Sequence, residues 1–319
     1  MKKIKNLAKA SLKLLAGLFR NKGKDPATAT ASPAAKAALQ DKKLLFIGNS
    51  YTMNGFAVIP KDCKTLTQKQ RSNDHGFFYQ LCKTHGIRVS VTNWCFSGHN
   101  ISQTFGGPCT AKGKACTGKD HATYLTDRNF DYVIIQCYKE EEYTQDLLSY
   151  LAPVTSLFRE ANPNVKFLLL VPHMACEKNY LWTQDLPAMQ QAGFTICNWG
   201  KMLHDICSGT VTVPHSQQKY DRLSFVVSVS KEDGYHENML AGYLTALMTY
   251  CAITGDSAVG QSYHFCDDPS LDLHFCLDAH KQLKYTYFTN TNFPEIFRSP
   301  GDMLGLQELT DRYLAEFNS

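Results

Sequence analysis

The first 24 residues lack acidic side chains, although they hold eight of the 33 Lys and Arg residues in this chain of 319. The remaining residues carry 25 basic side chains against 29 acidic ones, so the net charge of +4 comes from this one segment. Binding to nucleic acid depends on a basic surface that neutralises phosphates. The mildly acidic main part of the chain therefore argues against a nucleic-acid partner.

The same segment has no apolar run long enough to cross a bilayer, because Lys9 and Lys13 interrupt it. The uninterrupted apolar stretch at 14–19 is also too short for a good signal peptide. Residues 1–24 are therefore predicted to be a basic amphipathic segment that contacts an anionic membrane surface, or equally a solvated tail. Residues 25–40, rich in Ala, Thr and Pro, are predicted to be a flexible linker.

Twelve cysteines are present, but their settings do not indicate a disulfide framework. A set of four lies in apolar surroundings, where a thiol behaves as a small buried hydrophobic group: Cys137, Cys197, Cys207 and Cys251. Cys109 and Cys116 are the pair expected to bridge if the protein is exported. A cytoplasmic location, with or without peripheral membrane contact, is slightly favoured over export.

Short apolar runs alternate with helical patterns along the rest of the chain. The expected strands are 44–47, 87–91, 132–135, 167–171 and 194–197, and the clearest helices are 74–85, 144–161, 237–254 and 301–317. This alternation predicts an α/β fold, a three-layer α/β/α sandwich with a mostly parallel five-stranded sheet. Residues 41–258 are expected to form the main domain, with 259–319 as a C-terminal extension packed on it.

The first strand ends at Gly48-Asn49-Ser50, where the chain is expected to turn. Ligands of open α/β sheets bind beyond the carboxyl ends of the strands, so Ser50 would face such a crevice. Asn49 and Ser50 could equally cap the next element.

A second motif supports a catalytic interpretation of Ser50. Asp233 precedes His236 by three residues, in a turn that leads into the helix expected at 237–254. This spacing lets the carboxylate reach Nδ1 of the imidazole while Nε2 faces outward, which is the arrangement that a serine nucleophile needs from its base.

These motifs together resemble the GDSL/SGNH hydrolases. Gly48-Asn49-Ser50-Tyr51-Thr52 is similar to their first block, with Asn in place of Asp; Gly98 matches the glycine of their second block; and Asp233-x-x-His236 is similar to their last block. The resemblance implies a flavodoxin-like SGNH domain at 41–258 and a Ser50–His236–Asp233 catalytic triad. It also implies an oxyanion hole that includes the N–H groups of Ser50 and Gly98.

The third block of that family, Gly-x-Asn-Asp, is missing here. The corresponding stretch is Tyr138-Lys139-Glu140-Glu141, so the asparagine that completes the oxyanion hole has no counterpart. Gln136, at the end of the third strand, could supply the donor instead, or it could bond to backbone. Asn49, Tyr51, His99 and Asn100 are expected to contact substrate.

No metal or organic cofactor is expected. A zinc site at His264, Cys266, His274 and Cys276 is the less favoured interpretation of two His-Phe-Cys repeats, which an aromatic loop or a disulfide would also explain. The Gly-x-Ser-x-Gly elbow of α/β-hydrolases is absent.

The sequence thus predicts a serine esterase that hydrolyses a small ester through an acyl-enzyme, for example O-acetyl groups on a carbohydrate. The expected partner is a small-molecule or carbohydrate ester. An acyltransferase using the same site is one alternative. A catalytically silent carbohydrate- or membrane-binding module that keeps the fold is another.

Overall fold

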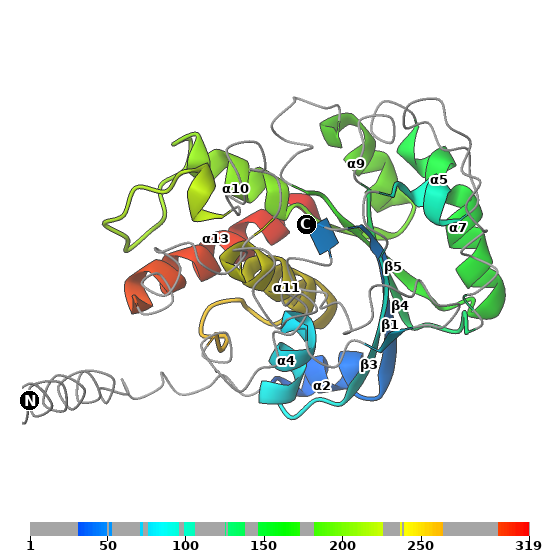
Figure 1. Ribbon diagram of the computed structural model, residues 1–319. Helices are drawn as coiled ribbons and strands as arrows, with labels where there is room; N and C mark the ends of the chain where they lie inside the picture. The colour runs from blue at the N-terminus through cyan, green and yellow to red at the C-terminus, as the bar shows by residue number, and fades with distance from the viewer. Residues whose placement is uncertain are drawn as a thin grey trace, which may run out of the picture.

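A computed structural model describes residues 31–49, 51–52, 71–72, 76–95, 99–105, 125, 127–137, 146–172, 182–225, 237, 239–263 and 299–318, with backbone only at 71–72, 182–185, 223 and 239. One six-stranded sheet lies at its centre (Figure 1). Its strands are β1 (Lys42–Gly48), β2 (Arg71–Ser72), β3 (Val89–Cys95), β4 (Tyr132–Gln136), β5 (Lys166–Leu170) and β6 (Phe194–Cys197).

The strand order across the sheet is β2-β3-β1-β4-β5-β6. Strands β3, β1, β4, β5 and β6 pair in parallel, whereas the short β2 pairs antiparallel with β3 at the edge. Without β2, the five parallel strands follow the order second, first, third, fourth, fifth, which is the flavodoxin-like order. The predicted fold class is therefore confirmed, and the two-residue β2 is an addition that the sequence pattern did not indicate.

Helices cover both faces of the sheet (Figure 1). One face carries α2 (Pro33–Leu39), α4 (Phe77–Thr84), α10 (Trp199–Cys207), α11 (Met239–Thr254) and α13 (Pro300–Asn318). The other face carries α5 (Ile101–Thr104), α7 (Leu147–Ala161) and α9 (Trp182–Gln191). A 3-10 turn, η3 (Arg222–Ser224), lies between α10 and α11 in the chain.

Strand β1 feeds both hydrophobic cores. Leu44 and Phe46 pack in the core under α11, and Leu45 and Ile47 pack in the core under α7. All four side chains have no solvent exposure. A strand covered on both faces is expected to be apolar without alternation, which explains the uninterrupted Leu-Leu-Phe-Ile run.

Helix α2 corrects the expectation of a flexible linker over 25–40 for the part at 33–39; residues 25–30 lie outside the described residues. The Ser32 hydroxyl accepts a hydrogen bond from the Ala35 N–H (3.0 Å) and caps the helix. Ala35 and Leu39 are fully buried in the core with α4 and α11. Burial against distant helices stabilises this short Ala-rich stretch, which a composition-based argument cannot detect.

Helix α7 runs through Pro153 from residue 147 to residue 161, so the proline does not mark a new helix start. The Asp146 carboxylate caps the helix by accepting hydrogen bonds from the N–H groups of Leu148 (3.1 Å) and Ser149 (3.3 Å). This cap places the helix start six residues before Pro153, where the sequence pattern had left two alternatives open.

Helix α13 covers the outer edge of the sheet at β6. The Asn318 side chain accepts a hydrogen bond from Ile196 N–H (2.8 Å) and donates one to Ile196 O (2.8 Å). An edge strand otherwise presents such backbone groups to other chains. The helix expected over 301–317 therefore satisfies this part of β6.

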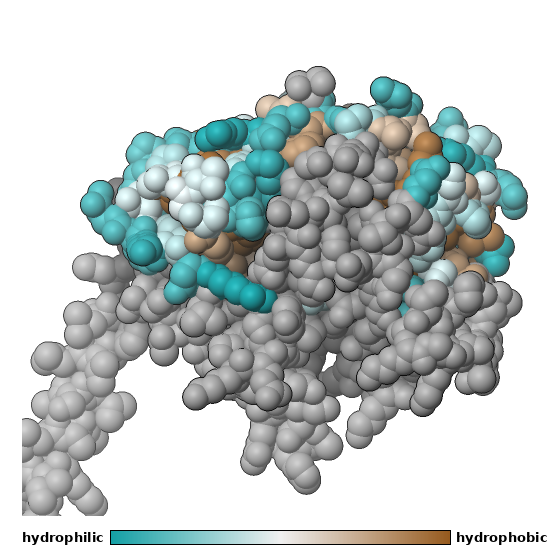
Figure 2. Space-filling model, turned by 90° about the horizontal axis from the view of Figure 1, so that it is seen from above, coloured by the Kyte–Doolittle hydropathy of each residue, from teal (hydrophilic) through white to brown (hydrophobic). Residues whose placement is uncertain are grey.

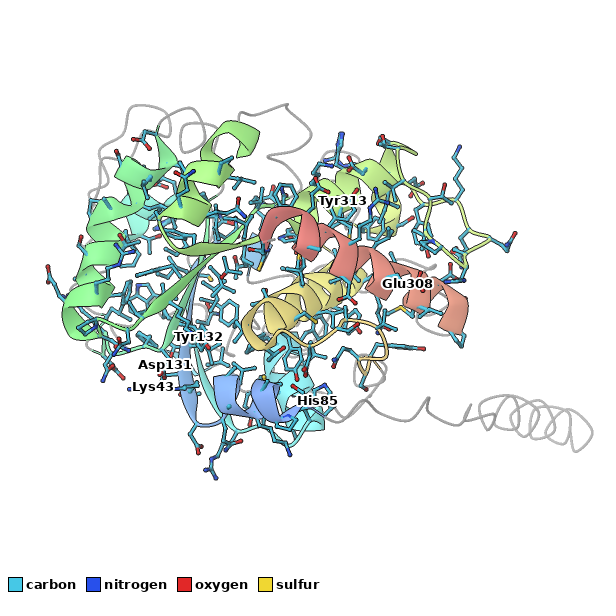
Figure 3. The ribbon with its side chains drawn as sticks, turned by 180° about the vertical axis from the view of Figure 1, so that it is seen from behind. Lys43, His85, Asp131, Tyr132, Glu308 and Tyr313 are labelled. Atoms are coloured by element: carbon cyan, nitrogen blue, oxygen red, sulfur yellow. The ribbon has the colours of Figure 1, made fainter. Side chains whose placement is uncertain are left out.

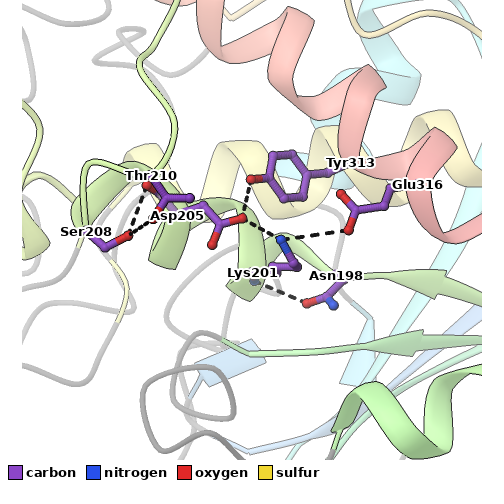
Figure 4. A network of polar contacts seen from close by, with 7 residues as sticks. All are labelled: Asn198, Lys201, Asp205, Ser208, Thr210, Tyr313 and Glu316. Carbon is purple, nitrogen blue, oxygen red and sulfur yellow. Dashed lines mark hydrogen bonds and ion pairs between the residues drawn. The ribbon is translucent and has the colours of Figure 1, made fainter.

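Polar contacts also fasten α13 to α10 (Figure 4). The Tyr313 hydroxyl donates to Asp205 (2.5 Å), and Lys201 contacts Asp205 (2.5 Å) and Glu316 (3.7 Å). Burial, together with the hydrogen bond to Asp205, raises the pKa of Tyr313. Tyr313 thus remains a neutral hydrogen-bond donor at ordinary pH, and Asp205 accepts from both Tyr313 and Lys201.

Asp131 holds the N-terminal end of β1 and lies beside Lys43 and Tyr132 (Figure 3). Its carboxylate accepts bonds from the Lys43 N–H (2.9 Å) and from Lys42 Nζ (2.9 Å). Burial alone would raise the pKa of Asp131, but these bonds lower it overall. The ion pair is partly exposed, so its contribution to stability is small.

Within the part of the chain that the structure describes, no helix combines the length and apolar character needed to cross a membrane. Teal and white areas of the described surface are interspersed with brown ones in the view from above (Figure 2). Val259 is the exposed large hydrophobic residue among the described positions.

We expect Gly305→Ala to destabilise the protein. A Cβ at this position of α13 would collide with the backbone oxygen of Pro214. Gly to Ala inside a helix normally stabilises by about 0.5–1 kcal/mol, so the expected net loss of about 1–3 kcal/mol has the opposite sign. Urea unfolding would measure it, with Glu308→Ala on the same helix as the control, since the Glu308–His215 pair is exposed. A variant as stable as the wild type would contradict this close contact.

Candidate functional site

The order of the strands reverses at β1, whose neighbours are β3 on one side and β4 on the other. The carboxyl ends of these three strands lie together: Gly48 pairs with Cys95, and Ile47 pairs with Ile135, the residue before Gln136. In open α/β sheets this reversal point is where ligands bind. The topology therefore predicts that a ligand site lies at the residues that follow Gly48, Cys95 and Gln136.

Asn49 connects two of the predicted motifs. Its side chain is fully buried, and Oδ1 accepts the N–H of Tyr51 (3.0 Å), which joins the positions on either side of Ser50. Nδ2 donates to the backbone oxygen of His99 (3.1 Å), the residue after Gly98. One carboxamide thus ties the turn after β1 to the segment after β3, across 50 positions of sequence.

Gln136 connects the same turn to β4. Its Oε1 accepts hydrogen bonds from the N–H (3.0 Å) and the hydroxyl (2.5 Å) of Thr52, and its Nε2 donates to Cys137 O (3.2 Å). Only 2% of Gln136 is exposed, and Thr52 is equally buried. The amide does bond to backbone, as one of the two sequence-based interpretations had it, and its role as an oxyanion donor stays a prediction.

Gly48 makes room for this contact. A Cβ on Gly48 would lie 2.5 Å from Thr52 Oγ1 and 3.1 Å from Gln136 Oε1. A Cβ cannot be accommodated 2.5 Å from Thr52 Oγ1, so steric hindrance explains why a glycine precedes Asn49. The Thr52–Gln136 contact is therefore a further feature of the site, and sequence reasoning missed it because the two residues are 84 positions apart.

Tyr51 and Asn100, two of the predicted substrate contacts, are buried. The Asn100 side chain caps α5 by accepting the Gln103 N–H (2.8 Å), while Gln103 Oε1 accepts the Asn100 N–H (2.8 Å). This capping box gives Asn100 a structural role. His99 is partly buried, and its contact with substrate stays a prediction.

Several predicted site residues lie outside the described residues: Ser50, Gly98, Asp233, His236, Cys109, Cys116, His264, Cys266, His274 and Cys276. The basic segment 1–24 lies outside them as well. Within the described ranges, no group of three or more His, Cys, Asp or Glu side chains is placed to hold a metal ion. Cys82, Cys197 and Cys251 are buried thiols, and burial raises the pKa of Cys197 to about 12.

Glu237, which follows His236 in the sequence, was not singled out by the sequence analysis. Only 1% of it is exposed, and neither carboxyl oxygen has a hydrogen-bond partner in the described part of the chain. Burial raises the pKa of Glu237 well above its ordinary value. A carboxyl group in this setting is held neutral, because burying an unpaired charge is costly.

We expect Asn49→Asp, which introduces the residue of the resembled motif, to destabilise this protein. An ionised carboxylate would place an oxygen against His99 O, where Nδ2 now donates over 3.1 Å. The expected loss is about 1–3 kcal/mol, and it should be larger at pH 8 than near pH 4, where a protonated Asp can donate. Urea unfolding at both pH values measures it, with the exposed Asn164→Asp as the control. Equal stability of Asn49→Asp and wild type at pH 8 would contradict the bridge.

We expect Glu237→Gln to stabilise the protein by a margin that grows with pH. Above about pH 4.3 the unfolded chain loses the Glu237 proton, whereas burial raises the pKa of Glu237 in the folded protein well above that value. This group therefore lowers wild-type stability as the pH rises, by up to about 1.4 kcal/mol per pH unit until the folded carboxyl itself ionises. Gln does not ionise and removes that slope. Unfolding free energies at pH 5, 6 and 7 would test this, beside the exposed Glu160→Gln. A margin that stays constant between pH 5 and 7 would contradict a buried neutral Glu237.

No protein-family model and no curated protein matches the chain. Among solved structures it is similar to a carbohydrate esterase family 2 enzyme from Corynascus thermopiles (13% identity, 68% of this chain and 67% of that chain, TM-score 0.40). It is also similar to a GDSL-like lipase candidate from Parabacteroides merdae (14% identity, 68% and 97%, TM-score 0.41). A third similar structure is that of an acetylxylan esterase from Geobacillus stearothermophilus (15% identity, 69% of this chain and 96% of that chain, TM-score 0.43). These values describe a partial likeness in chain path.

Proposed function

We propose that this protein is a serine esterase that hydrolyses a small ester through Ser50, His236 and Asp233. The observation that carries the proposal is the Asn49 bridge, which holds the residues around Ser50 against the segment that follows Gly98. This bridge lies beyond the carboxyl end of β1, at the reversal of strand order where ligands of such sheets bind. Asn49 of the first motif thus contacts His99, the residue next to Gly98 of the second motif.

The proposed reaction follows from the chemistry of these side chains. His236 takes the proton of the Ser50 hydroxyl as Oγ attacks the ester carbonyl carbon, and Asp233 orients and stabilises the imidazolium. The N–H groups of Ser50 and Gly98 stabilise the oxyanion. His236 then returns the proton to the departing alcohol, and water releases the acyl group from Ser50 by the same steps in reverse.

Gln136 is the proposed third donor to the oxyanion. Its Nε2 carries two hydrogens, and Cys137 O accepts one of them. The second would serve where the missing Gly-x-Asn-Asp asparagine serves in the resembled family. The proposal requires no metal and no organic cofactor.

An O-acetyl group on a carbohydrate is the substrate that we propose to test first. This choice rests on the resemblance of the motifs to the GDSL/SGNH hydrolases.

We expect Ser50→Ala to abolish hydrolysis of p-nitrophenyl acetate, with a loss of at least about 10³-fold in kcat. Ser208→Ala, an exposed serine at the end of α10, should keep wild-type turnover. A fluorophosphonate should label the wild type at the peptide that contains Ser50, as read by mass spectrometry.

Equal turnover by Ser50→Ala and wild type would contradict the proposed nucleophile. Product analysis with added sugars separates hydrolysis from acyl transfer, because transfer yields a new sugar ester. Saccharide binding without turnover, unchanged in Ser50→Ala, would instead indicate a silent binding module.

A further inference from the structure

We propose that Thr52 is a positioning residue. It fixes the orientation of the Gln136 side-chain amide, so that Nε2 is always available as a hydrogen-bond donor to the transition state. This inference rests on the proposed esterase function and deepens it. The role is assigned from the buried contact between two segments that the sheet brings together, the turn after β1 and the end of β4.

The orientation of the Gln136 amide follows from its partners. A backbone N–H can only donate, so the Gln136 atom 3.0 Å from Thr52 N must be the oxygen. A backbone carbonyl can only accept, so the Gln136 atom 3.2 Å from Cys137 O must be the nitrogen. Two independent groups on opposite ends of the amide therefore select the same orientation.

Turning the amide over would be costly at this place. It would set Nε2 against the Thr52 N–H and Oε1 against the carbonyl of Cys137, so two bonds would become repulsive contacts. Gln136 and Thr52 are each 2% exposed, so water cannot readily replace the lost bonds. The nitrogen thus remains on the side of Cys137, with one hydrogen beyond the bond to that carbonyl.

The Thr52 hydroxyl is the removable part of this arrangement. It donates to Gln136 Oε1 at 2.5 Å and occupies the space that a Cβ on Gly48 would need. Thr52→Val keeps the shape of the side chain and the backbone N–H but removes the hydroxyl donor. The substitution therefore loosens the amide without opening a cavity, and it isolates positioning from packing.

We expect Thr52→Val to lower kcat on p-nitrophenyl acetate about tenfold, with KM within about twofold of the wild type. Thr52→Ser restores the hydroxyl and should restore kcat. Thr155→Val is the matched control, because it removes another buried hydroxyl donor, one that bonds to the backbone carbonyl of Ala152 (3.0 Å) within α7.

A double-mutant cycle tests whether Thr52 acts through Gln136. Gln136→Met removes the amide and should lower kcat more than Thr52→Val does, by about 10²-fold. The double variant should be no slower than Gln136→Met alone, because the hydroxyl then has no amide to orient. Additive losses, or a kcat of Thr52→Val within twofold of the wild type, would overturn the inference.

A failure of the esterase proposal can be distinguished from a failure of the positioning role of Thr52. If the wild type neither hydrolyses esters nor reacts with the fluorophosphonate, the proposed function fails and the amide is tested directly. Hydrogen exchange of the Gln136 side-chain amide, assigned by its absence from the NMR spectrum of Gln136→Met, should be faster in Thr52→Val. Unchanged exchange would overturn the positioning role of Thr52 as well.

Discussion

Strand β1 pairs in parallel with β3 on one side and with β4 on the other, and Leu44, Leu45, Phe46 and Ile47 are all removed from solvent. Both hydrophobic cores depend on this strand, since alternate side chains enter opposite layers. The chain that leaves it is also enclosed. Asn49, Tyr51 and Thr52 are buried, so each of their polar groups needs a partner close at hand.

The partners come from the two neighbouring strands. Asn49 reaches the segment after β3, and Thr52 reaches Gln136 at the end of β4. Buried hydrogen bonds of this kind favour one arrangement, because a shift would leave a buried polar group unsatisfied. Asn49 and Thr52, the described residues that flank Ser50 in the sequence, are therefore held by hydrogen bonds to both neighbouring strand ends, as the proposed role of the Ser50 N–H would require. Glu237 shows a different condition: it is a buried carboxyl whose pKa is raised by burial.

Helix α13 completes the layer on the face of α11 and closes the sheet at its open edge. Asn318 takes the place of a further strand at Ile196, while Tyr313 and Lys201 share the Asp205 carboxylate. Close packing of Gly305 against Pro214 O permits the helix to approach the segment after α10. A sheet edge covered in this way is protected from pairing with other chains.

Local patterns in the sequence determined much of the fold. The run 194–197 forms β6 with the predicted bounds, and Gly86, which has a positive φ of 65°, follows the C-cap of α4. Such features depend on residues close together in the chain. Helix α2 and the contact between Thr52 and Gln136 depend on distant ones: Leu39 is buried by helices far along the chain, and Gln136 lies 84 residues from Thr52. Only the tertiary structure could decide helix α2 and the Thr52–Gln136 contact. The free energy of a buried contact depends on which distant residues the fold brings together, and local sequence patterns do not indicate those pairs.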